Sequence, residues 1–374
     1  MRAIPTLARI PDQVVSLPDH ESYAQTHLDA NAWAYFSGGA ADEITLRANQ
    51  QAWHDLHLQP RVLQALSGGH TRVQLLGRTL AHPILLAPVA YQAMAYPDGE
   101  LATAHAAAAL GAGLVLSTQS SVALEPVAQA MLSERDRGPL WFQLYLQHDR
   151  GFTRELLHRV EAAGYEALVL TVDAPTSGAR DRERRAGFRL PPGVRAVNLE
   201  GLQPPSPRSL ATGQSALFDD VLPQAPTWDD VAWLQAQTRL PVLLKGVLHE
   251  DDARQAAQLG VSGLIVSNHG GRTLDTAPAT AWVLPRISAA VQGSMPVLVD
   301  GGIRRGTDVL KALALGAKAV LVGRPYIYGL ANAGAVGVAH VLRLLRDELE
   351  IAMALCGCRQ LDQVSPALLF QASN

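Results

Sequence analysis

The chain has 374 residues, of which 48% are hydrophobic and 17% are charged, and its formal net charge is −3. This composition can supply a large apolar core and excludes an intrinsically disordered protein. The charge is nearly balanced and the sequence has no basic stripe, so we expect no nucleic-acid partner.

The cysteines and the chain ends bear on where the protein works. Cys356 and Cys358 are too close for an ordinary disulfide and too few for a metal cage, which favours a reducing compartment and no metal site. Residues 1–15 lack the apolar core of a signal peptide, and residues 371–374 do not form a peroxisomal tripeptide. No apolar run reaches the length of a membrane span. We therefore expect a cytoplasmic protein that does not enter a membrane.

The first 82 residues precede the repeating part of the chain. Residues 19–53 have a helical pattern interrupted at Ser37-Gly38-Gly39-Ala40, which predicts helices that cap one end of the fold. Residues 72–82 contain two short strand-like runs on either side of a glycine turn. They predict a hairpin that closes the floor of a barrel.

From Pro83 onward a short apolar run is repeatedly followed by a helical pattern, as in residues 99–110 and 307–315. This order is typical of parallel strands joined by crossover helices. Eight such units predict an α/β protein with a TIM (β/α)8 barrel at 83–358, within a single domain spanning 1–374. The predicted strands are 84–87, 114–117, 140–145, 167–172, 241–245, 263–267, 296–299 and 319–322.

Nearly every predicted strand ends on residues that can bind or react. An inert barrel can carry a few polar residues there, but a full ring of them indicates a ligand across the carboxyl end of the barrel. In chain order these residues are Pro88-Val89-Ala90, Ser117-Thr118-Gln119, Gln143 with Tyr145, Thr171 with Asp173, Lys245, Ser267 to His269, Asp300-Gly301-Gly302 and Gly323-Arg324.

The last two strands are followed by glycines and arginines, in Asp300 to Gly306 and in Val322 to Pro325. Barrels commonly bind a phosphate at these two strand ends, where glycines expose backbone N–H groups and arginines neutralise the anion. Two ordinary surface turns are the alternative. The first strand is not followed by G-x-G-x-x-G, which disfavours a nicotinamide-binding Rossmann domain.

The connection after the fourth strand, residues 174–226, is much longer than a usual strand-to-helix loop. It is rich in Pro, Gly, Ser and Arg, so it is either a lid over the active end or a disordered insertion. Four arginines, Arg180, Arg182, Arg184 and Arg185, favour a lid because a passive spacer does not need so many cations.

Residues 267–275, Ser-Asn-His-Gly-Gly-Arg-Thr-Leu-Asp, follow the sixth apolar run. His269 can move a proton near neutral pH, and Arg272 can hold a carboxylate in a two-pronged contact. A structural histidine beside a simple Gly-Gly turn is the plainer interpretation of these residues taken singly. Together they predict a proton-moving site for an acid.

Several motifs in order resemble the FMN-dependent 2-hydroxy acid oxidising family, which includes glycolate oxidase, lactate oxidase and mandelate dehydrogenase. The resemblance implies a TIM barrel with FMN as cofactor, and oxidation of an L-2-hydroxy acid to a 2-oxo acid. The motifs are Ala34 to Gly39, Leu86 to Ala90, Gln143-Leu144-Tyr145, Leu170 to Asp173, Leu244 to Val247, Ser267 to Arg272, Asp300 to Gly306 and Gly323-Arg324-Pro325.

The resemblance also implies roles for single residues at the substrate. His269 is similar to the catalytic base, and Asp173 to the carboxylate that stabilises its protonated form. Arg272 resembles the arginine that binds the substrate carboxylate, with Arg180 as a second cation and Tyr35 as a hydroxyl donor to the same group. Tyr145 resembles the residue that hydrogen-bonds the substrate hydroxyl. Taken alone, each has a plainer alternative as a structural aromatic or surface charge.

A further set of residues resembles the FMN site of the family. Lys245 is similar to the lysine beside the pyrimidine edge of the flavin, where a fixed positive charge stabilises the reduced ring. Asp300 is similar to the residue that contacts the ribityl chain. The implied ring contacts are Pro88, Val89, Ala90, Ser117, Gln143, Thr171 and Ser267, and the implied phosphate contacts are Gly302, Arg304, Gly323 and Arg324.

The resemblance indicates the electron acceptor and the substrate less directly than it indicates the cofactor. Ala90 resembles the oxidases of the family, so we expect O2 as acceptor, with H2O2 as product. A dehydrogenase that reduces a quinone or a protein, and a barrel that binds FMN without turnover, are the alternatives. The family implies a homotetramer or octamer.

The predicted substrate pocket departs from that of glycolate oxidase. Gln119 stands where glycolate oxidase has tryptophan, Ser177 where a leucine is common, and Tyr91 follows Ala90 as in relatives that act on aromatic substrates. We therefore expect a more polar pocket than a simple alkyl hydroxy acid needs.

Overall fold

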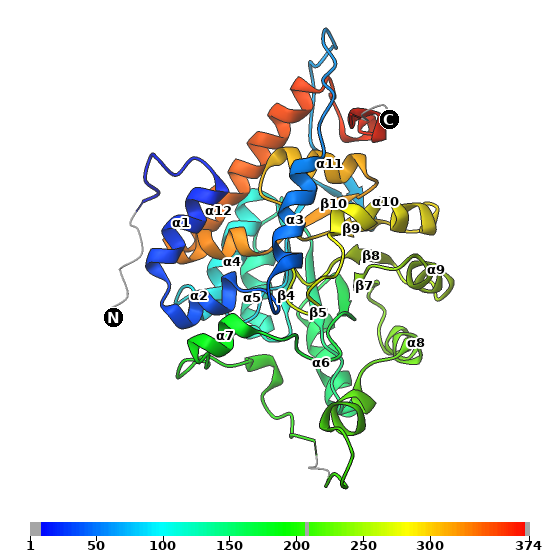
Figure 1. The fold of residues 1–374 in the computed structure, drawn as a ribbon. Helices are drawn as coiled ribbons and strands as arrows, with labels where there is room; N and C mark the ends of the chain where they lie inside the picture. Colours follow the sequence, from blue (N-terminus) through cyan, green and yellow to red (C-terminus); the bar gives the residue numbers. More distant parts are fainter. Residues whose placement is uncertain (1–8, 206–208, 371–374) are drawn as a thin grey trace.

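The computed structural model describes residues 9–205 and 209–370. Eight parallel strands close into a barrel in which the last strand pairs with the first (Figure 1). The predicted TIM barrel is therefore confirmed. Its strands are β3 (Ile84–Leu86), β4 (Gly113–Ser117), β5 (Leu140–Leu144), β6 (Ala167–Thr171), β7 (Val242–Val247), β8 (Gly263–Val266), β9 (Val297–Val299) and β10 (Ala319–Val322).

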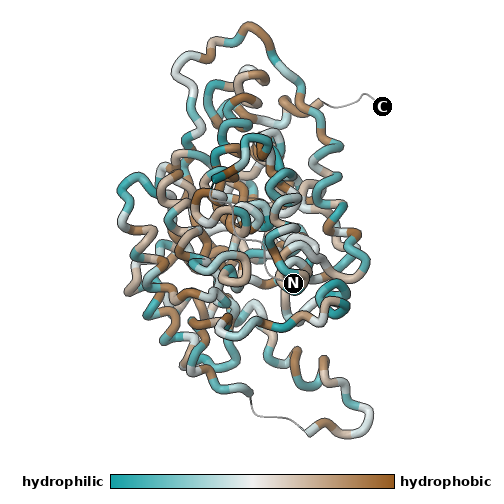
Figure 2. The backbone as a smooth tube through the Cα atoms, turned by 90° about the vertical axis from the view of Figure 1, so that its left-hand side faces the viewer, coloured by the Kyte–Doolittle hydropathy of each residue, from teal (hydrophilic) through white to brown (hydrophobic). Residues whose placement is uncertain are grey.

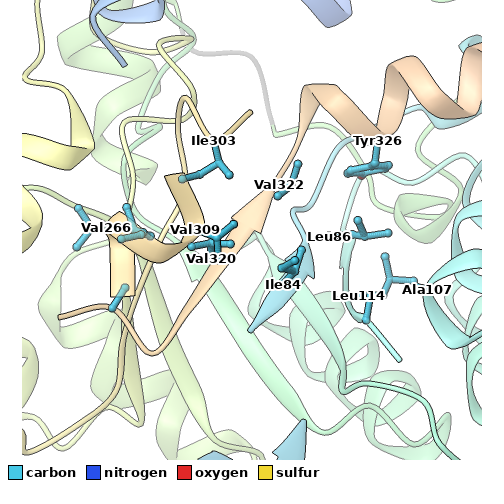
Figure 3. Close-up of a cluster of buried hydrophobic side chains, with 14 of the residues drawn as sticks. Ile84, Leu86, Ala107, Leu114, Val266, Ile303, Val309, Val320, Val322 and Tyr326 are labelled. Carbon is cyan, nitrogen blue, oxygen red and sulfur yellow. The ribbon is translucent and has the colours of Figure 1, made fainter. Parts of the chain in front are cut away.

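A helix follows each barrel strand and packs on the outside of the barrel. Their inward faces form one large core with the outward-facing side chains of the strands. Figure 3 shows part of it, where Leu86 of β3 lies with Ala107 and Tyr326 of the surrounding helices. These helices are α4 (Gly99–Leu110), α5 (Leu124–Leu132), α6 (Arg150–Ala162), α8 (Trp228–Gln237), α9 (Glu250–Gln258), α10 (Thr280–Val291), α11 (Gly306–Ala314) and α12 (Arg324–Leu355).

Polar and apolar residues are interleaved along the chain, and Figure 2 shows them alternating within the same helices. This is the pattern of amphipathic helices that bury one face and expose the other.

The barrel interior has its own core, separate from the one under the helices. Because side chains alternate across a strand, every second residue of each strand faces inward. Val115, Trp141, Val169, Leu243 and Ile265 fill the interior. Two residues further along, the same inward positions carry Ser117, Gln143, Thr171, Lys245 and Ser267, so the apolar interior ends in a polar layer at the carboxyl end of the strands.

The opposite end of the barrel is closed by the predicted hairpin. β1 (Val73–Leu75) pairs antiparallel with β2 (Arg78–Leu80). Leu75 and Leu80 are buried and pack against the interior cluster. The hairpin therefore forms the barrel floor, as expected.

From residue 9 onward, three helices precede the barrel: α1 (Leu17–His27), α2 (Ala30–Ser37) and α3 (Ile44–Asp55). The helical interpretation of 19–53 is confirmed. α3 covers the carboxyl end of the strands, because Trp53 donates its indole N–H to the carbonyl of Gly301 at 2.8 Å. Asn49 and Asn268 exchange two side-chain hydrogen bonds of 2.8 and 2.9 Å.

The long connection between β6 and α8 contains short helical segments in its described part: α7 (Asp181–Ala186), η2 (Val197–Leu199), η3 (Ala216–Val221) and η4 (Leu222–Gln224). α7 packs against α2. Asn198 is fully buried and bonds the backbone of Leu124 and the hydroxyl of Ser120. The connection therefore reaches over the active end, but its opening and closing as a lid stays a prediction.

α12 differs from the expectation that no apolar run reaches membrane-spanning length. It is long and apolar enough to cross a membrane, although 61% of its most apolar stretch is buried inside the protein. Its chain kinks at Ala333 and Gly334, and it packs against α1, α4 and α11. Burial in the core therefore accounts for its apolar character.

Two expectations concern the ends of the chain. Residues 1–8 and 371–374, on which those about a signal peptide and a peroxisomal tripeptide partly rest, are outside the described residues, as are residues 206–208. The grouping of 1–374 into one domain with boundaries at 82 and 358 stays a prediction.

The interior cluster yields a stability prediction. Trp141 is 2% exposed inside the barrel, so Trp141→Ala should lower the free energy of unfolding by about 3–5 kcal/mol by leaving a cavity. Trp282, 55% exposed on α10, is the matched control, and Trp282→Ala should change stability by no more than about 0.5 kcal/mol. Chemical denaturation of the two variants measures both free energies of unfolding. Equal denaturation midpoints for the two variants would contradict the interior packing.

Candidate active site

A cavity of about 1060 Å³, its open mouth included, lies at the carboxyl end of the barrel strands. The structure brings nearly all of the predicted site residues to its wall: Tyr35, Pro88, Val89, Ala90, Ser117, Gln119, Gln143, Tyr145, Thr171, Arg180, Lys245, His269, Arg272, Asp300, Gly302, Arg304, Gly323 and Arg324.

Two predicted residues lie behind the wall instead of on it. Ser267 is fully buried, and its hydroxyl bonds Lys245 Nζ at 2.9 Å and the backbone N–H of His269 at 3.0 Å. Both bonds are accepted by the Ser267 oxygen, and the expected contact between Ser267 and the flavin ring stays a prediction. Asp173 likewise contacts His269 from behind.

His269 is presented to the cavity by an unusual backbone. Its φ is 57°, and Gly270 and Gly271 follow with φ of 62° and 73°. Left-handed conformations cost energy for a residue with a side chain and persist at functional sites where the surroundings enforce them. The glycines also permit close packing, because a Cβ at Gly271 would lie 2.7 Å from the backbone N of Leu46. This loop turns the imidazole back over the barrel mouth.

The imidazole is oriented by a carboxylate. His269 Nδ1 lies 2.9 Å from Asp173 Oδ1, and His269 Nε2 lies 3.4 Å from the hydroxyl of Tyr145. Because an ionised carboxylate only accepts hydrogen bonds, Nδ1 carries the proton. The lone pair of Nε2 therefore faces the cavity, where it can accept a proton.

The charges around His269 suit a base. Burial lowers the pKa of His269 below its usual value, and the Asp173 carboxylate opposes this shift. Burial acts to raise the pKa of Asp173, but the charge and hydrogen bond of His269, together with Lys245, outweigh it and lower that pKa. The resting pair is thus a neutral imidazole beside an anion that stabilises the imidazolium.

Lys245 places a second charge at the polar layer. Its ammonium group is buried and lies 3.1 Å from Asp300 Oδ2. Burial acts to lower the pKa of Lys245, yet Asp300 and Asp173 raise it above its usual value, so the ammonium form persists. Asp300 Oδ1 is buried without a hydrogen-bond partner in the described residues. Because Asp300 lines the cavity, an unpartnered acceptor on this residue indicates a ligand that donates a hydrogen bond.

The neighbouring strand ends form a hydrogen-bonded row. Ser117 donates to Gln143 Oε1 at 3.2 Å, and Gln143 Nε2 donates to Thr171 Oγ1 at 3.0 Å. The row fixes the amide of Gln143 in one orientation. Amide and hydroxyl groups in this arrangement can bind the polar edge of a flat heterocycle.

The far end of the cavity suits an anion. Gly302, Gly323 and Arg304 line this end of the cavity, and Arg304 is 9% exposed. Burial lowers the pKa of Arg324 to about 10, and the charges of Arg272 and Arg304 contribute to this shift. Because these neighbouring cations repel one another, an anionic ligand that binds between them is favoured.

Arg324 departs from its expected role in one respect. Its guanidinium donates to the carbonyls of Phe36, Gly38 and Gly270 at 3.0, 2.7 and 2.9 Å. These bonds tie the end of α2 to the loop after β8, so Arg324 fastens the mouth of the cavity as well as lining it.

Arg272, Arg180 and Tyr35 also line the mouth, where Arg272 shares the Gly38 carbonyl with Arg324. Arg272 donates to the carbonyls of Tyr35 and Gly38, and its guanidinium carbon lies 4.9 Å from the centre of the Tyr35 ring. Burial raises the pKa of Tyr35 to about 12, so its hydroxyl is a proton-bearing donor. This group can bind a carboxylate opposite His269.

The sequence interpretation missed several residues at the mouth. Glu183 of α7 contacts both Arg180 and Arg272, at 3.0 Å each. Phe188 stacks on the Tyr35 ring with centroids 4.9 Å apart. The three-residue spacing from Arg180 to Glu183 was a signal for an ion pair, whereas nothing local in the sequence links Phe188 to Tyr35. Wall residues for which the sequence indicated no single role are Phe36, Ala87, Ile303, Leu321, Val322 and Ile327.

The geometry is that of a barrel enzyme whose polar layer can hold an anionic heterocyclic cofactor, with a histidine base and arginines that can bind a carboxylate beside it. Among residues 9–205 and 209–370, no group of three or more His, Cys, Asp or Glu residues could hold a metal ion.

Comparison with known proteins identifies the family. The model of the FMN-dependent dehydrogenase family matches residues 24–371, and the chain belongs to this family. FMN is its cofactor, which fits Asp300 Oδ1, Lys245 and the arginines around the cavity.

Relatives match over nearly the full length. An L-lactate oxidase of Nostoc sp. is 49% identical over 361 residues, covering 95% of this chain and 98% of the relative. Glycolate oxidase 1 of Zea mays is 43% identical, covering 94% of this chain and 95% of the relative. A solved structure of mandelate oxidase with (S)-2-phenylpropionate superposes with a TM-score of 0.85 at 42% identity, covering 96% of this chain and 98% of that chain.

The glycine loop after β9 yields a prediction for FMN binding. Gly302 has a φ of 84°, and a Cβ there would lie 2.1 Å from the carbonyl oxygen of Asn49, so Gly302→Ala should weaken FMN binding at least tenfold by displacing the loop. Gly293 has a φ of 74° with no atom within 4 Å of the built Cβ, so Gly293→Ala controls for backbone strain alone. Fluorescence titration of apoprotein with FMN measures both, and equal affinities would refute the steric argument.

Proposed function

We propose that this protein uses FMN to oxidise an L-2-hydroxy acid to the 2-oxo acid and passes the electrons to O2, which becomes H2O2. The observation that carries the proposal is the pairing of His269 with Asp173 opposite Arg272, in the cavity that suits FMN. The relatives support the reaction, since they are an L-lactate oxidase, a glycolate oxidase and a peroxisomal (S)-2-hydroxy-acid oxidase.

The residues at the mouth hold the substrate. Arg272 binds the substrate carboxylate, with Arg180 and the hydroxyl of Tyr35 on the same side. Tyr145 donates its hydroxyl proton to the substrate hydroxyl; burial raises the pKa of Tyr145, which keeps that proton in place. These contacts orient the substrate before any proton moves.

His269 then removes a proton from the substrate at Nε2. The imidazolium that forms keeps its Nδ1–H bond to Asp173, whose negative charge stabilises it. When bound, FMN supplies the redox chemistry by accepting two electrons from the substrate and releasing them to O2. Lys245 holds a positive charge beside the polar layer, where it stabilises negative charge that develops during the reaction.

The cavity supports a substrate with a polar side chain over a plain alkyl one. Gln119 lines the wall, and its side-chain amide has no hydrogen-bond partner within the described chain. Its backbone is fixed, because its carbonyl accepts from Tyr91 N–H at 3.2 Å. The amide is therefore available to a hydrogen-bonding group on the substrate.

We further propose a cytoplasmic homo-oligomer, either a tetramer or an octamer, that binds neither membrane nor nucleic acid. The free cysteines Cys356 and Cys358 fit a reducing compartment. Leu63 is fully exposed and Val62 is 77% exposed, which suits an interface between subunits. The formal net charge of −3 gives no support to nucleic-acid binding.

An anaerobic spectrum tests the function. The visible spectrum of the FMN-loaded protein should bleach with L-2-hydroxy acids and not with their D-enantiomers, and air should restore it with one H2O2 formed per substrate. His269→Ala should retain the flavin spectrum but reduce the bleaching rate at least about 100-fold, because the proton acceptor is lost. Unchanged bleaching would exclude His269 as the base. Bleaching that air does not reverse would favour a dehydrogenase, and bound flavin that no acid bleaches would favour a binding protein.

The His269–Asp173 pair predicts a pH effect. The base must be neutral in the free enzyme, so kcat/KM should fall as the pH drops through the pKa of His269, which lies below its usual 6.5. Asp173 raises this pKa against burial, so Asp173→Asn should move the acid limb to lower pH. It should also reduce the maximal kcat/KM on the order of 100-fold, because the imidazolium loses its partner. A pH profile measures both effects, and an acid limb that stays in place would contradict the assigned pairing.

A further inference from the structure

The substrate-binding arginines already share a carboxylate of the protein. Glu183 Oε1 lies 3.0 Å from Arg272 Nη2 and 3.0 Å from Arg180 Nη1. The side chains of Glu183 and Arg272 are each only 14% exposed, so solvent screens this interaction weakly. One oxygen atom therefore joins the two cations that face the substrate.

This contact changes the charge that the substrate meets. Arg180, Arg272 and Glu183 together carry one net positive charge, and the further charge of Arg324, whose guanidinium bonds the same Gly38 carbonyl as Arg272, is expected to be balanced by the FMN phosphate. The other nearby acids are engaged elsewhere, since Asp173 pairs with His269 and Asp300 with Lys245. One substrate carboxylate balances the mouth, whereas a second would leave an unpaired negative charge in a partly buried site.

The position of Glu183 is fixed by the rest of α7. Arg182 on the same helix pairs with Glu43 and donates to the hydroxyl of Ser37 at 2.9 Å. Arg180 donates through Nε to the carbonyl of Arg272 at 3.1 Å. These contacts hold α7 against α2 and the loop after β8. They therefore fix the Glu183 carboxylate in position beside Arg180 and Arg272.

We propose that Glu183 determines substrate charge: by sharing its carboxylate between Arg180 and Arg272, it restricts the enzyme to 2-hydroxy acids with a single carboxylate. The inference rests on the proposed function and deepens it. Arg180 is accordingly not a free second cation, and Glu183 is a specificity-determining residue that acts through the arginines.

The test uses two substrates that differ in charge and hardly in shape, L-malate and its β-amide. The wild-type enzyme should have a kcat/KM for the amide that is at least roughly tenfold higher, because a like-charge contact disfavours the dianion. Glu183→Gln removes the competing charge and should shift the ratio at least tenfold towards malate. Glu183→Asp keeps the charge and should keep the preference for the amide.

Asp181→Asn is the matched control on the same helix. Asp181 pairs only at the surface, 3.6 Å from Arg184 and 3.7 Å from Arg185, so the control removes one negative charge from α7 without changing the arginine pair at the substrate. Its substrate ratio should equal that of the wild type. A shift as large as that of Glu183→Gln would overturn the proposal, because the general charge of α7 would then be the cause.

Binding provides a second readout that needs no turnover. Calorimetric dissociation constants for 2-oxoglutarate and its ω-amide should show the same preference in wild type and the same shift in Glu183→Gln. A wild-type protein that binds and oxidises both members of each pair equally would overturn the proposal even if the variant does not fold. A protein that oxidises no 2-hydroxy acid would refute the proposed function, while the binding ratio would still decide the role of Glu183.

Discussion

The alternation of side chains across the barrel strands is the constraint on which the site depends. In a closed barrel, each inward position must either pack against the interior or face the open end. Val169 and Leu243 fill the interior, and Thr171 and Lys245, two residues further on, have no apolar layer above them. The cofactor site is therefore the last layer of the barrel core, with polar residues in place of apolar ones.

Electrostatic pairing then sets the protonation state of the charged groups at this end of the barrel. Lys245 keeps its positive charge because Asp300 lies beside it. Burial keeps His269 neutral, and Asp173 is the counter-ion of the imidazolium that forms when His269 takes up a proton. Burial alone would neutralise these groups. Since each pair joins residues from different strand ends, closing the barrel is what brings the partners together.

The segments outside the barrel complete the mouth. α3 packs onto the loops after β8 and β9, and Arg324 binds the carbonyls of Phe36 and Gly38 at the end of α2. α7 brings Glu183 to the arginines from the long connection after β6. The barrel thus supplies the cofactor site, and the N-terminal helices and α7 supply the walls that meet the substrate.

The amino-acid sequence was enough to predict the barrel, the floor hairpin, the N-terminal helices and the polar layer, because these follow from local periodicity and from where each strand ends. It also predicted His269, Arg272 and Lys245 as site residues at the carboxyl ends of the strands. Only the tertiary structure showed that Ser267 lies behind Lys245, that Arg324 bonds backbone carbonyls, and that Glu183 shares the arginines. Glu183 and Arg272 are 89 residues apart, and such a contact depends on how loops cross in space, which no local pattern records.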